Sequence, residues 1–180
     1  MTQEFTITAF SENHIGLLNR ITIIFTRRHI NIESLTVSAS AIEGLHKFTV
    51  VVNASKDLVE KVVKQIDKLV EVTKAFYHSN DEIIHQEIAL YKVPTKALLE
   101  SNEIESMVRK NSARIIEVTP DYTVIEKTGH SEETQEMFEK LNKFGVLQFT
   151  RSGRIAVTKL KEELLTRYLE EVKRNKELAN

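Results

Sequence analysis

The stretch that decides the fold is FTITAFSENHIGLLNRITIIF, residues 5–25. Its first part alternates apolar residues with threonines, and this period of two predicts a strand with one buried face. A short polar loop, residues 12–16, follows. Apolar residues then recur on one helical face, which predicts an amphipathic helix carrying Leu17, Leu18, Ile21, Ile24 and Phe25. Arg27 and Arg28 are expected in its last turn, where positive charge suits the helix dipole.

The residues after this helix complete a unit of order βαββαβ. Period-two patterns over 30–41 and 46–52, joined by Glu43–Gly44, predict a β-hairpin. Ser55 is the expected N-cap of a second helix. The buried face of that helix is expected to carry Val59, Val62, Val63 and Ile66. A fourth strand is expected over 70–77.

The same order of elements repeats after a polar linker at 79–82. Strands are expected over 84–93, 115–118, 122–125 and 146–149. A helix over about 95–111 is expected to bury Leu98, Leu99, Ile104, Met107 and Val108. Ser131 is expected to cap the second helix, which Gly145 ends. The sequence therefore predicts an α+β chain of two similar modules, residues 1–78 and 84–158.

Residues 159–180 are left over and form an amphipathic pattern of leucines between charges. We expect this helix to pack against the second module. The alternative is a helix that binds a partner or a second copy of the chain.

Composition excludes several classes of protein. The 180 residues are 41% hydrophobic and 28% charged, which is typical of a soluble globular chain. The net charge of −1 argues against binding nucleic acid or an anionic membrane by bulk electrostatics. We see no secretory signal and no apolar run near the roughly 20 residues of a membrane helix. The lack of cysteine excludes disulfides and thiolate chemistry and suits a cytoplasmic location.

Motifs that carry chemistry are missing. The six histidines have no metal-ligand spacing, and no nucleophile elbow, P-loop or dinucleotide fingerprint occurs. We therefore expect no catalytic residues, metal or cofactor in this chain. RNA binding on the sheet is the competing use of this topology, but the central strand HKFTVVV has Phe48 as its only aromatic residue.

The loop at 12–16 is the one candidate site. It precedes a helix whose first N–H groups are free to bind a small anion such as a carboxylate. Gly16 allows close approach of the backbone, and Asn13 and Asn31 offer side-chain amides. The residues alone leave another interpretation open, in which Asn13 is only a helix cap and Asn31 only a turn residue.

Four stretches together resemble the small, regulatory subunit of acetolactate synthase, also called acetohydroxyacid synthase. They are SENHIGLLNRITIIFTRRHINIESLTV (11–37), QEIALYKV (86–93), RIIEVTPDYTVIEKTG (114–129) and TRSGRIAV (150–157). The resemblance implies two tandem ferredoxin-like modules, an N-terminal ACT domain for effector binding and dimerisation and a related C-terminal domain. Residues 159–180 lie beyond it.

The resemblance also implies a function without chemistry in this chain. Such subunits bind and activate the large catalytic subunit, which uses thiamine diphosphate, magnesium and FAD, and they make it sensitive to a branched-chain amino acid, usually valine. ACT domains of this family pair side by side as homodimers with the effector between the copies. The implied effector-site residues are Asn13, His14, Ile15, Gly16, Leu17, Asn31 and Ile32.

Two other functions remain as alternatives. One is a self-standing ACT-type sensor of amino acids that acts on another target, although no output domain is left in the chain. The other is a small enzyme on a ferredoxin-like scaffold, which the missing nucleophile and acid–base groups disfavour.

Overall fold

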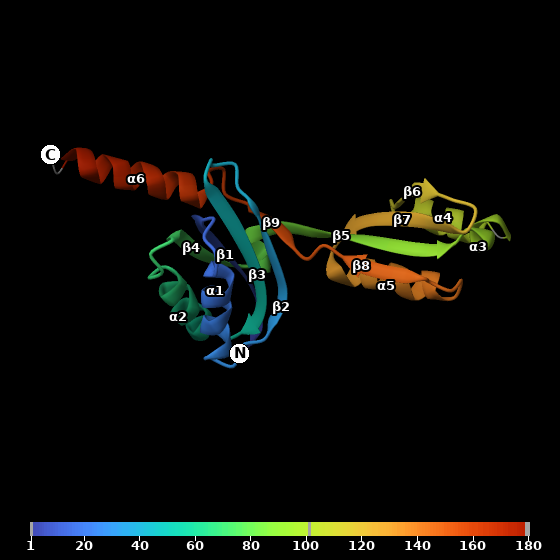
Figure 1. Cartoon of the computed structure of the whole chain (residues 1–180), viewed down its shortest axis with the longest axis horizontal. Coiled ribbons are helices and arrows are strands. Elements are labelled where there is room, and N and C mark those ends of the chain that lie inside the picture. Colours follow the sequence, from blue (N-terminus) through green and yellow to red (C-terminus); the bar gives the residue numbers. More distant parts are fainter. Residues whose placement is uncertain (1, 101, 179–180) are drawn as a thin grey trace. The chain divides into compact units, whose positions relative to one another are not determined.

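The computed structural model describes residues 2–100 and 102–178 and divides them into two compact units (Figure 1). The first unit contains the residues up to Ile84 together with those from Ala156 onward, and the second contains His85–Ile155. The chain therefore passes into the second unit and returns to the first. Each unit is described by itself below.

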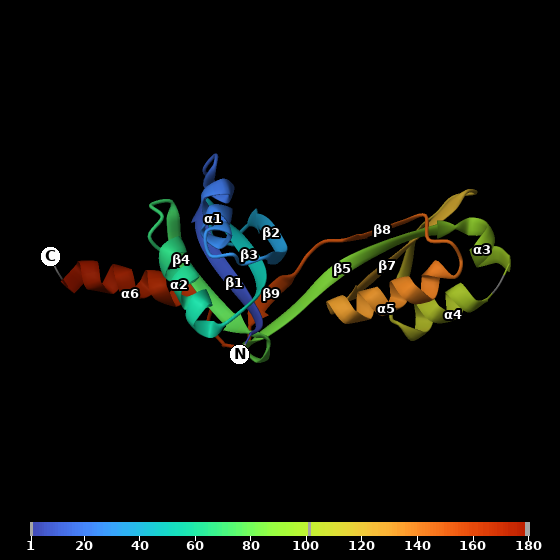
Figure 2. The ribbon, with the colours of Figure 1, turned by 90° about the horizontal axis from the view of Figure 1, so that it is seen from below.

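The first unit is a four-stranded antiparallel sheet with two helices on one face (Figure 2). Its strands stand in the order β2-β3-β1-β4, so the first and third strands are central. The elements are β1 (Gln3–Glu12), α1 (Leu17–Thr26), β2 (Ile32–Ala39), β3 (Leu45–Ala54), α2 (Lys56–Ile66) and β4 (Val72–Ser79). A 3-10 turn, η1 (Asn80–Glu82), follows β4. The predicted order βαββαβ is confirmed.

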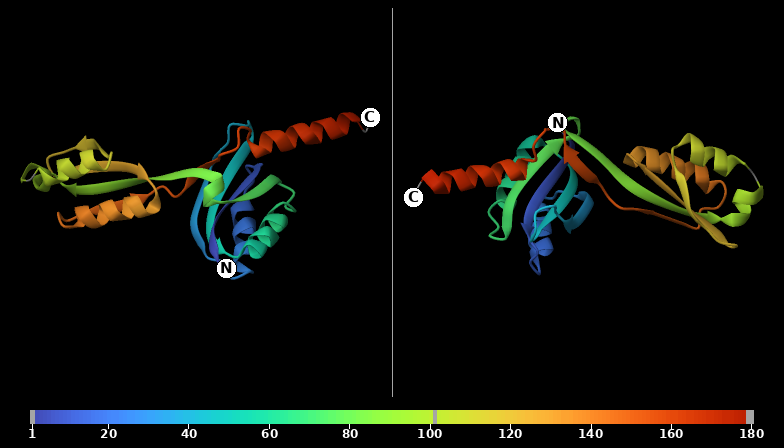
Figure 3. Two further views of the ribbon diagram at one scale, coloured as in Figure 1. Left: turned by 180° about the vertical axis from the view of Figure 1, so that it is seen from behind. Right: turned by 90° about the horizontal axis from the view of Figure 1, so that it is seen from above.

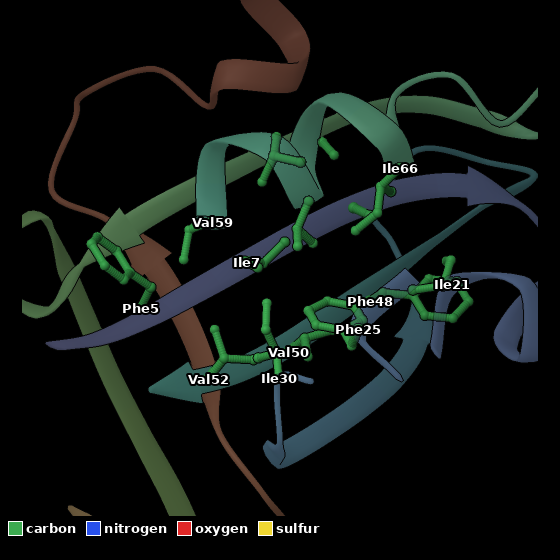
Figure 4. Packing of buried hydrophobic residues seen from close by; sticks show 14 of the residues in the cluster. Phe5, Ile7, Ile21, Phe25, Ile30, Phe48, Val50, Val52, Val59 and Ile66 are labelled. Atoms are coloured by element: carbon green, nitrogen blue, oxygen red, sulfur yellow. The ribbon is translucent and has the colours of Figure 1, made fainter. Parts of the chain in front are cut away.

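The core of this unit lies between the sheet and its two helices (Figure 4). β1 and β3 each supply alternate residues to it, as the period of two predicts, and the helices supply the expected apolar faces except for Leu18. The buried set includes Phe5, Ile7, Ala9, Leu17, Ile21, Phe25, Phe48, Val50, Val52, Val59, Val62, Val63 and Ile66. Because Phe48 is part of this core, it is not a surface aromatic on which a base could stack.

The second unit repeats the topology. Its sheet has the order β6-β7-β5-β8, which corresponds strand for strand to the order of the first sheet. The elements are β5 (Ile83–Pro94), α3 (Thr95–Glu100), α4 (Glu103–Lys110), β6 (Arg114–Val118), β7 (Tyr122–Gly129), α5 (Ser131–Asn142) and β8 (Gln148–Arg151). Its core includes Ala89, Tyr91, Val93, Ile104, Val108, Ile125, Met137 and Leu141. The predicted α+β fold of two ferredoxin-like modules is confirmed.

Several local predictions were wrong. The helix expected over 95–111 is in two pieces, α3 and α4, and Leu99 is 80% exposed. α1 ends at Thr26, so Arg27 and Arg28 follow it rather than forming its last turn. Its Leu18 is exposed, because the residues of α1 that face the sheet are Leu17, Ile21 and Phe25, with Ile24 partly buried beside them.

Three boundaries also differ from the prediction. The residue that caps α5 is His130, whose backbone N–H donates to the Glu133 carboxylate at 2.7 Å, and Ser131 is the first helical residue. Val70 lies outside β4 and is exposed. The expected linker at 79–82 is structured, because Glu82 accepts hydrogen bonds from the N–H and the hydroxyl of Ser79 at 2.9 Å.

The C-terminal segment corrects the prediction for residues 159–180. A short strand not expected from the sequence, β9 (Ile155–Thr158), pairs with β5, and α6 (Leu164–Leu178) follows. From Ala156 onward the segment belongs to the first unit, not the second. Leu165 is completely buried there, whereas residues 173–178 are all exposed, and Figure 3 shows α6 extending past the sheet. The helical pattern predicts a buried face but not which module covers it.

Candidate functional site

The loop that joins β1 to α1 is built around Gly16. This residue has φ +83°, a left-handed conformation in which residues other than glycine are strained. A Cβ placed on it would meet no atom within 4 Å, so the backbone angle and not lack of space requires glycine here. The loop therefore presents open space directly before the first turn of α1.

That first turn is open to an anion. Gly16 is the N-cap of α1, no side chain caps the helix, and its first turn holds no acidic residue. The N–H of Leu17 donates to the carbonyl O of His14 at 3.2 Å. The N–H groups that follow it in the first turn have no partner within the helix, and the dipole adds partial positive charge. A ligand carboxylate fits this position.

A hollow of about 160 Å³ lies beside this helix end. It is lined by Glu12, Asn13, His14, Gly16, Leu17, Leu18, Val37, His46 and Phe48. Four predicted site residues line it: Asn13, His14, Gly16 and Leu17. The side chain of Leu17 itself belongs to the core and so forms the floor of the hollow.

Sequence reasoning placed Glu12 in the loop but missed the four other lining residues: Leu18, Val37, His46 and Phe48. A signal for two of them was present, because His46 is in phase with Phe48 on the strand whose alternate residues face the helices. In the register of β1 with β3, His46 stands opposite Ser11. Among the described residues, neither the Ser11 hydroxyl nor the Nδ1 atom of His46 has a hydrogen-bond partner, although both atoms are buried. Buried polar atoms of this kind are uncommon in proteins, so both atoms are free to form a hydrogen bond with a water molecule or a ligand.

Arg20, a cation on the helix that begins at the loop, is engaged in an ion pair within the first unit. Its guanidinium forms an ion pair with Glu71. A backbone hydrogen bond to the Glu71 carboxyl, and next the Arg20 guanidinium, lower the pKa of that carboxyl. Because Arg20 is engaged, the N-terminus of α1 is the stronger candidate for binding an anion.

The predicted residues Asn31 and Ile32 lie at the other end of the same sheet. Ile32 pairs with Val52, and Val52 with Phe5, near the start of β1. The loop at 12–16 follows the end of β1. The separation is about seven residues along a strand, or about 23 Å at 3.3 Å per residue. Asn31 donates from Nδ2 to the Glu33 carboxylate at 3.2 Å. One copy of the chain therefore does not bring all seven predicted residues together.

Apolar side chains line the edge of the sheet next to the hollow. β2 is an edge strand, and Val37 on it is exposed. Leu18 is also exposed, and Ile15 in the loop is 98% exposed. An edge strand offers unpaired backbone groups to another strand. This edge therefore combines unpaired backbone groups with exposed apolar side chains, which are features of a surface that pairs with another protein chain.

The second unit has a cluster of polar and charged side chains in which Glu87 and Thr134 are buried and Arg151 is partly buried. Glu87 accepts a hydrogen bond from the Thr134 hydroxyl at 2.5 Å and pairs with Arg151 Nε at 3.4 Å. The Tyr91 hydroxyl donates to the Thr134 carbonyl at 2.7 Å, and burial raises the pKa of Tyr91 to about 12. These contacts tie β5, β8 and α5 together, so we interpret them as structural.

The described residues offer neither a metal site nor a helix that could span a membrane. Within residues 2–100 and 102–178 no group of three or more His, Cys, Asp or Glu side chains is placed to hold a metal. No described helix is both long enough and apolar enough to cross a membrane.

Comparison with known proteins gives the class of the chain. Residues 7–74 match the family model of the AHAS small subunit-like ACT domain. Residues 86–160 match the family model of the small subunit of acetolactate synthase. The fold, its glycine-containing loop and these matches define an ACT-domain protein.

Individual relatives agree with the family models. The chain is 35% identical to the acetolactate synthase small subunit of Bacillus subtilis over 83% of this chain and 87% of that protein. It is 31% identical to a probable acetolactate synthase small subunit of Methanothermobacter thermautotrophicus over 85% and 91% of the two chains. The crystal structure of the acetolactate synthase small subunit from Thermotoga maritima superposes with a TM-score of 0.80 at 27% identity, over 89% of this chain and 99% of that one.

The chain belongs to the family of acetolactate synthase small subunits. Its role is therefore that of a regulatory subunit, and membership of this family implies a large catalytic subunit as its partner.

Proposed function

We propose that this chain binds a branched-chain amino acid, with valine as the first candidate, between two copies of its ACT unit. Through this site it imposes feedback inhibition on the large catalytic subunit of acetolactate synthase, which it otherwise activates. Thiamine diphosphate, magnesium and FAD belong to that catalytic subunit in this proposal. The chain itself performs no chemistry.

The observation that carries the proposal is the uncapped start of α1 at Gly16, beside a hollow of about 160 Å³. The N–H groups of the helix suit the effector carboxylate. The wall formed by Leu18, Val37 and Phe48 suits an aliphatic side chain. A cavity of about 150 Å³ holds a molecule of benzene, so a side chain as small as that of valine fits the space.

Pairing of two copies supplies the rest of the site. A symmetric dimer uses the same surface on both copies, so an edge strand β2 meets its equivalent in antiparallel orientation. The start of β2 in one copy then lies beside the end of β2 in the other. That end, Ala39, is in register with His46 and Ser11, which lie next to the hollow. Asn31 and Ile32 of one copy thereby reach the hollow of its partner.

An effector shifts activity only through a difference in affinity for two states of the complex. The proposal therefore predicts that site variants change inhibition without abolishing activation. We expect Asn13→Ala and Gly16→Asp to remove the inhibition by valine while the catalytic subunit remains activated, because the first loses an amide and the second places a charge where the carboxylate binds. The measurement is the rate of acetolactate formation by the reconstituted enzyme as valine is increased.

Asn19→Ala is the matched control, because Asn19 is an exposed asparagine on α1 that does not line the hollow. It should retain the inhibition curve of the unmodified chain. Unchanged inhibition curves for both site variants would refute the site. If the chain alters no rate of the catalytic subunit at all, the alternative of a self-standing sensor with another target is favoured.

A further inference from the structure

Much of the face of the first sheet that points away from α1 and α2 is buried. Alternate residues of β1, β3 and β4 lie on this outer face, and it has its own buried set: Thr6, Thr8, Phe10, Thr49, Val51 and His78. Residues 156–165, which end β9 and begin α6, cover it. Leu165 anchors this cover and is completely buried.

The cover leaves a cavity of about 230 Å³ between itself and the sheet. Phe10 and Phe76 contribute aromatic rings from the sheet, and Leu160, Leu164 and Leu165 contribute aliphatic side chains from the returning segment. The polar groups among its walls include Lys47, His78 and Glu163. All of these residues belong to the first unit. This cavity lies on the opposite face of the sheet from the proposed effector site.

Lys47 places a cation in this apolar space. Its Nζ atom donates to the Ala156 carbonyl O at 3.0 Å and lies 5.8 Å from the centre of the Phe10 ring. Burial lowers the pKa of Lys47, and the Glu163 carboxylate raises it by a smaller amount. An ammonium group has three N–H donors, so donors remain for a further acceptor. Burying a charge is unfavourable unless a counter-charge accompanies it, and the effect of the Glu163 carboxylate on the pKa of Lys47 is smaller than that of burial.

We propose that this cavity is a second small-molecule site, which binds an aliphatic monocarboxylate with its carboxylate on Lys47 and its hydrocarbon body against Phe10, Phe76 and the leucines. The volume exceeds the roughly 150 Å³ that holds benzene, so a chain of about five or six carbons fits. Among the charged residues that line the cavity, Lys47 and Lys161 outnumber the Glu163 carboxylate, so a ligand carboxylate is favoured over a ligand ammonium. Fatty acids and 2-oxo acids of this size therefore bind better than the corresponding amino acid.

Three probes with one carbon skeleton test this preference on the full chain: 4-methylpentanoate, 4-methyl-2-oxopentanoate and leucine. Binding is followed by methyl NMR of leucine-labelled protein. We expect one or both acids that lack an ammonium to shift the methyl signals of Leu160, Leu164 and Leu165. Leucine should bind this cavity more weakly, and the relative affinities of the two acids separate a fatty acid from an oxo acid as the ligand.

Two variants test the residues of the cavity. Lys47→Met removes the charge but keeps most of the side chain, and we expect it to weaken binding about tenfold or more, because a charge-assisted hydrogen bond is lost. Lys64→Met is the matched control, since Lys64 lies on α2, on the other face of the sheet. Thr8→Leu fills the cavity from its floor without altering Lys47, and it should also abolish binding.

A second readout does not depend on NMR. The ligand touches both the sheet and the returning segment, so it should slow cleavage by trypsin after the exposed Lys161. Gly16→Asp should leave binding at this cavity unchanged, which separates the result from the fate of the effector site. The proposal is overturned if neither acid shifts these methyl signals at millimolar concentration, if leucine binds the cavity as well as the acids do, or if Lys47→Met and Thr8→Leu both bind like the unmodified chain.

Discussion

Gly16 and Gly44 are equivalent in backbone geometry but differ in their surroundings. Both have positive φ, +83° and +78°, and at both a Cβ would meet no atom within 4 Å. Gly44 lies in the hairpin turn between β2 and β3, whereas Gly16 borders the hollow at the start of α1. The pair therefore allows strain in the backbone to be separated from binding.

At this scale we predict that Gly16→Ala and Gly44→Ala lower the free energy of unfolding by similar amounts, about 1–2 kcal/mol each, because a left-handed residue with a Cβ costs about that much. Only Gly16→Ala should also weaken inhibition by valine, since its methyl group enters the space beside the helix N-terminus. Urea unfolding measures the first effect and the reconstituted enzyme assay the second. Equal loss of inhibition in both variants would mean that strain, not the site, explains the effect.

At the scale of elements, α6 shows that an amphipathic helix does not specify its partner. Its one completely buried residue, Leu165, lines the same cavity as Phe10 and Phe76 of the outer face of the first sheet. Lys74 of β4 also lies over the ring of Tyr168, 5.3 Å from its centre. The segment therefore adds a third layer to the first unit.

We predict that Leu165→Ala lowers the stability of the first unit by about 2–5 kcal/mol, the usual cost of truncating a fully buried leucine. Hydrogen exchange should become faster in β1 and β4, and exchange in β7 of the second unit should not change. Leu178→Ala, in the exposed last turn of the same helix, is the control and should have little effect. Faster exchange in β7 instead would show that α6 serves the second unit.

At the scale of the whole molecule, the predicted effector residues form one site only when two chains combine. Asn13 and Asn31 lie at opposite ends of one sheet, about 23 Å apart along the strands. In the proposed dimer each site takes Asn13 from one copy and Asn31 from the other. Mixing two defective chains can therefore rebuild an intact site.

We predict that Asn13→Ala and Asn31→Ala chains are each insensitive to valine and that an equal mixture recovers part of the inhibition. Half of the randomly formed dimers carry both kinds of chain, and one of their two sites is intact, so roughly a quarter of all sites return. Valine titration of the mixture after subunit exchange measures this recovery. A mixture as insensitive as either variant alone would contradict a shared site.

Much of the fold could be predicted because the periodic patterns are local. The alternation of Phe5, Ile7 and Ala9 and the helical spacing of Val59, Val62 and Ile66 match the buried faces of β1 and α2. The errors lie where a neighbour decides burial. Leu18 and Leu99 continue an apolar pattern but have no element packed over them.

The loop at 12–16 and its free helix N-terminus could also be located from the sequence, because a glycine before an amphipathic helix is a local feature. The phase of the strand relates His46 to Phe48, but it could not assign them or Val37 to the hollow, since only the register of β1, β2 and β3 brings these residues beside the loop. The separation of Asn13 from Asn31 follows from strand direction, which no spacing along the chain reveals.

The sequence by itself determined the two βαββαβ modules, the absence of cysteine chemistry and the family to which the chain is similar. These depend on residue identity and on periods of two and 3.6 residues, which neighbouring residues fix. Only the tertiary structure decided that residues 156–178 return to the first module and that residues 156–165 line a cavity there with Lys47 in its wall. The reason is that a hydrophobic face is buried by any complementary surface, so its partner depends on the packing of the whole chain.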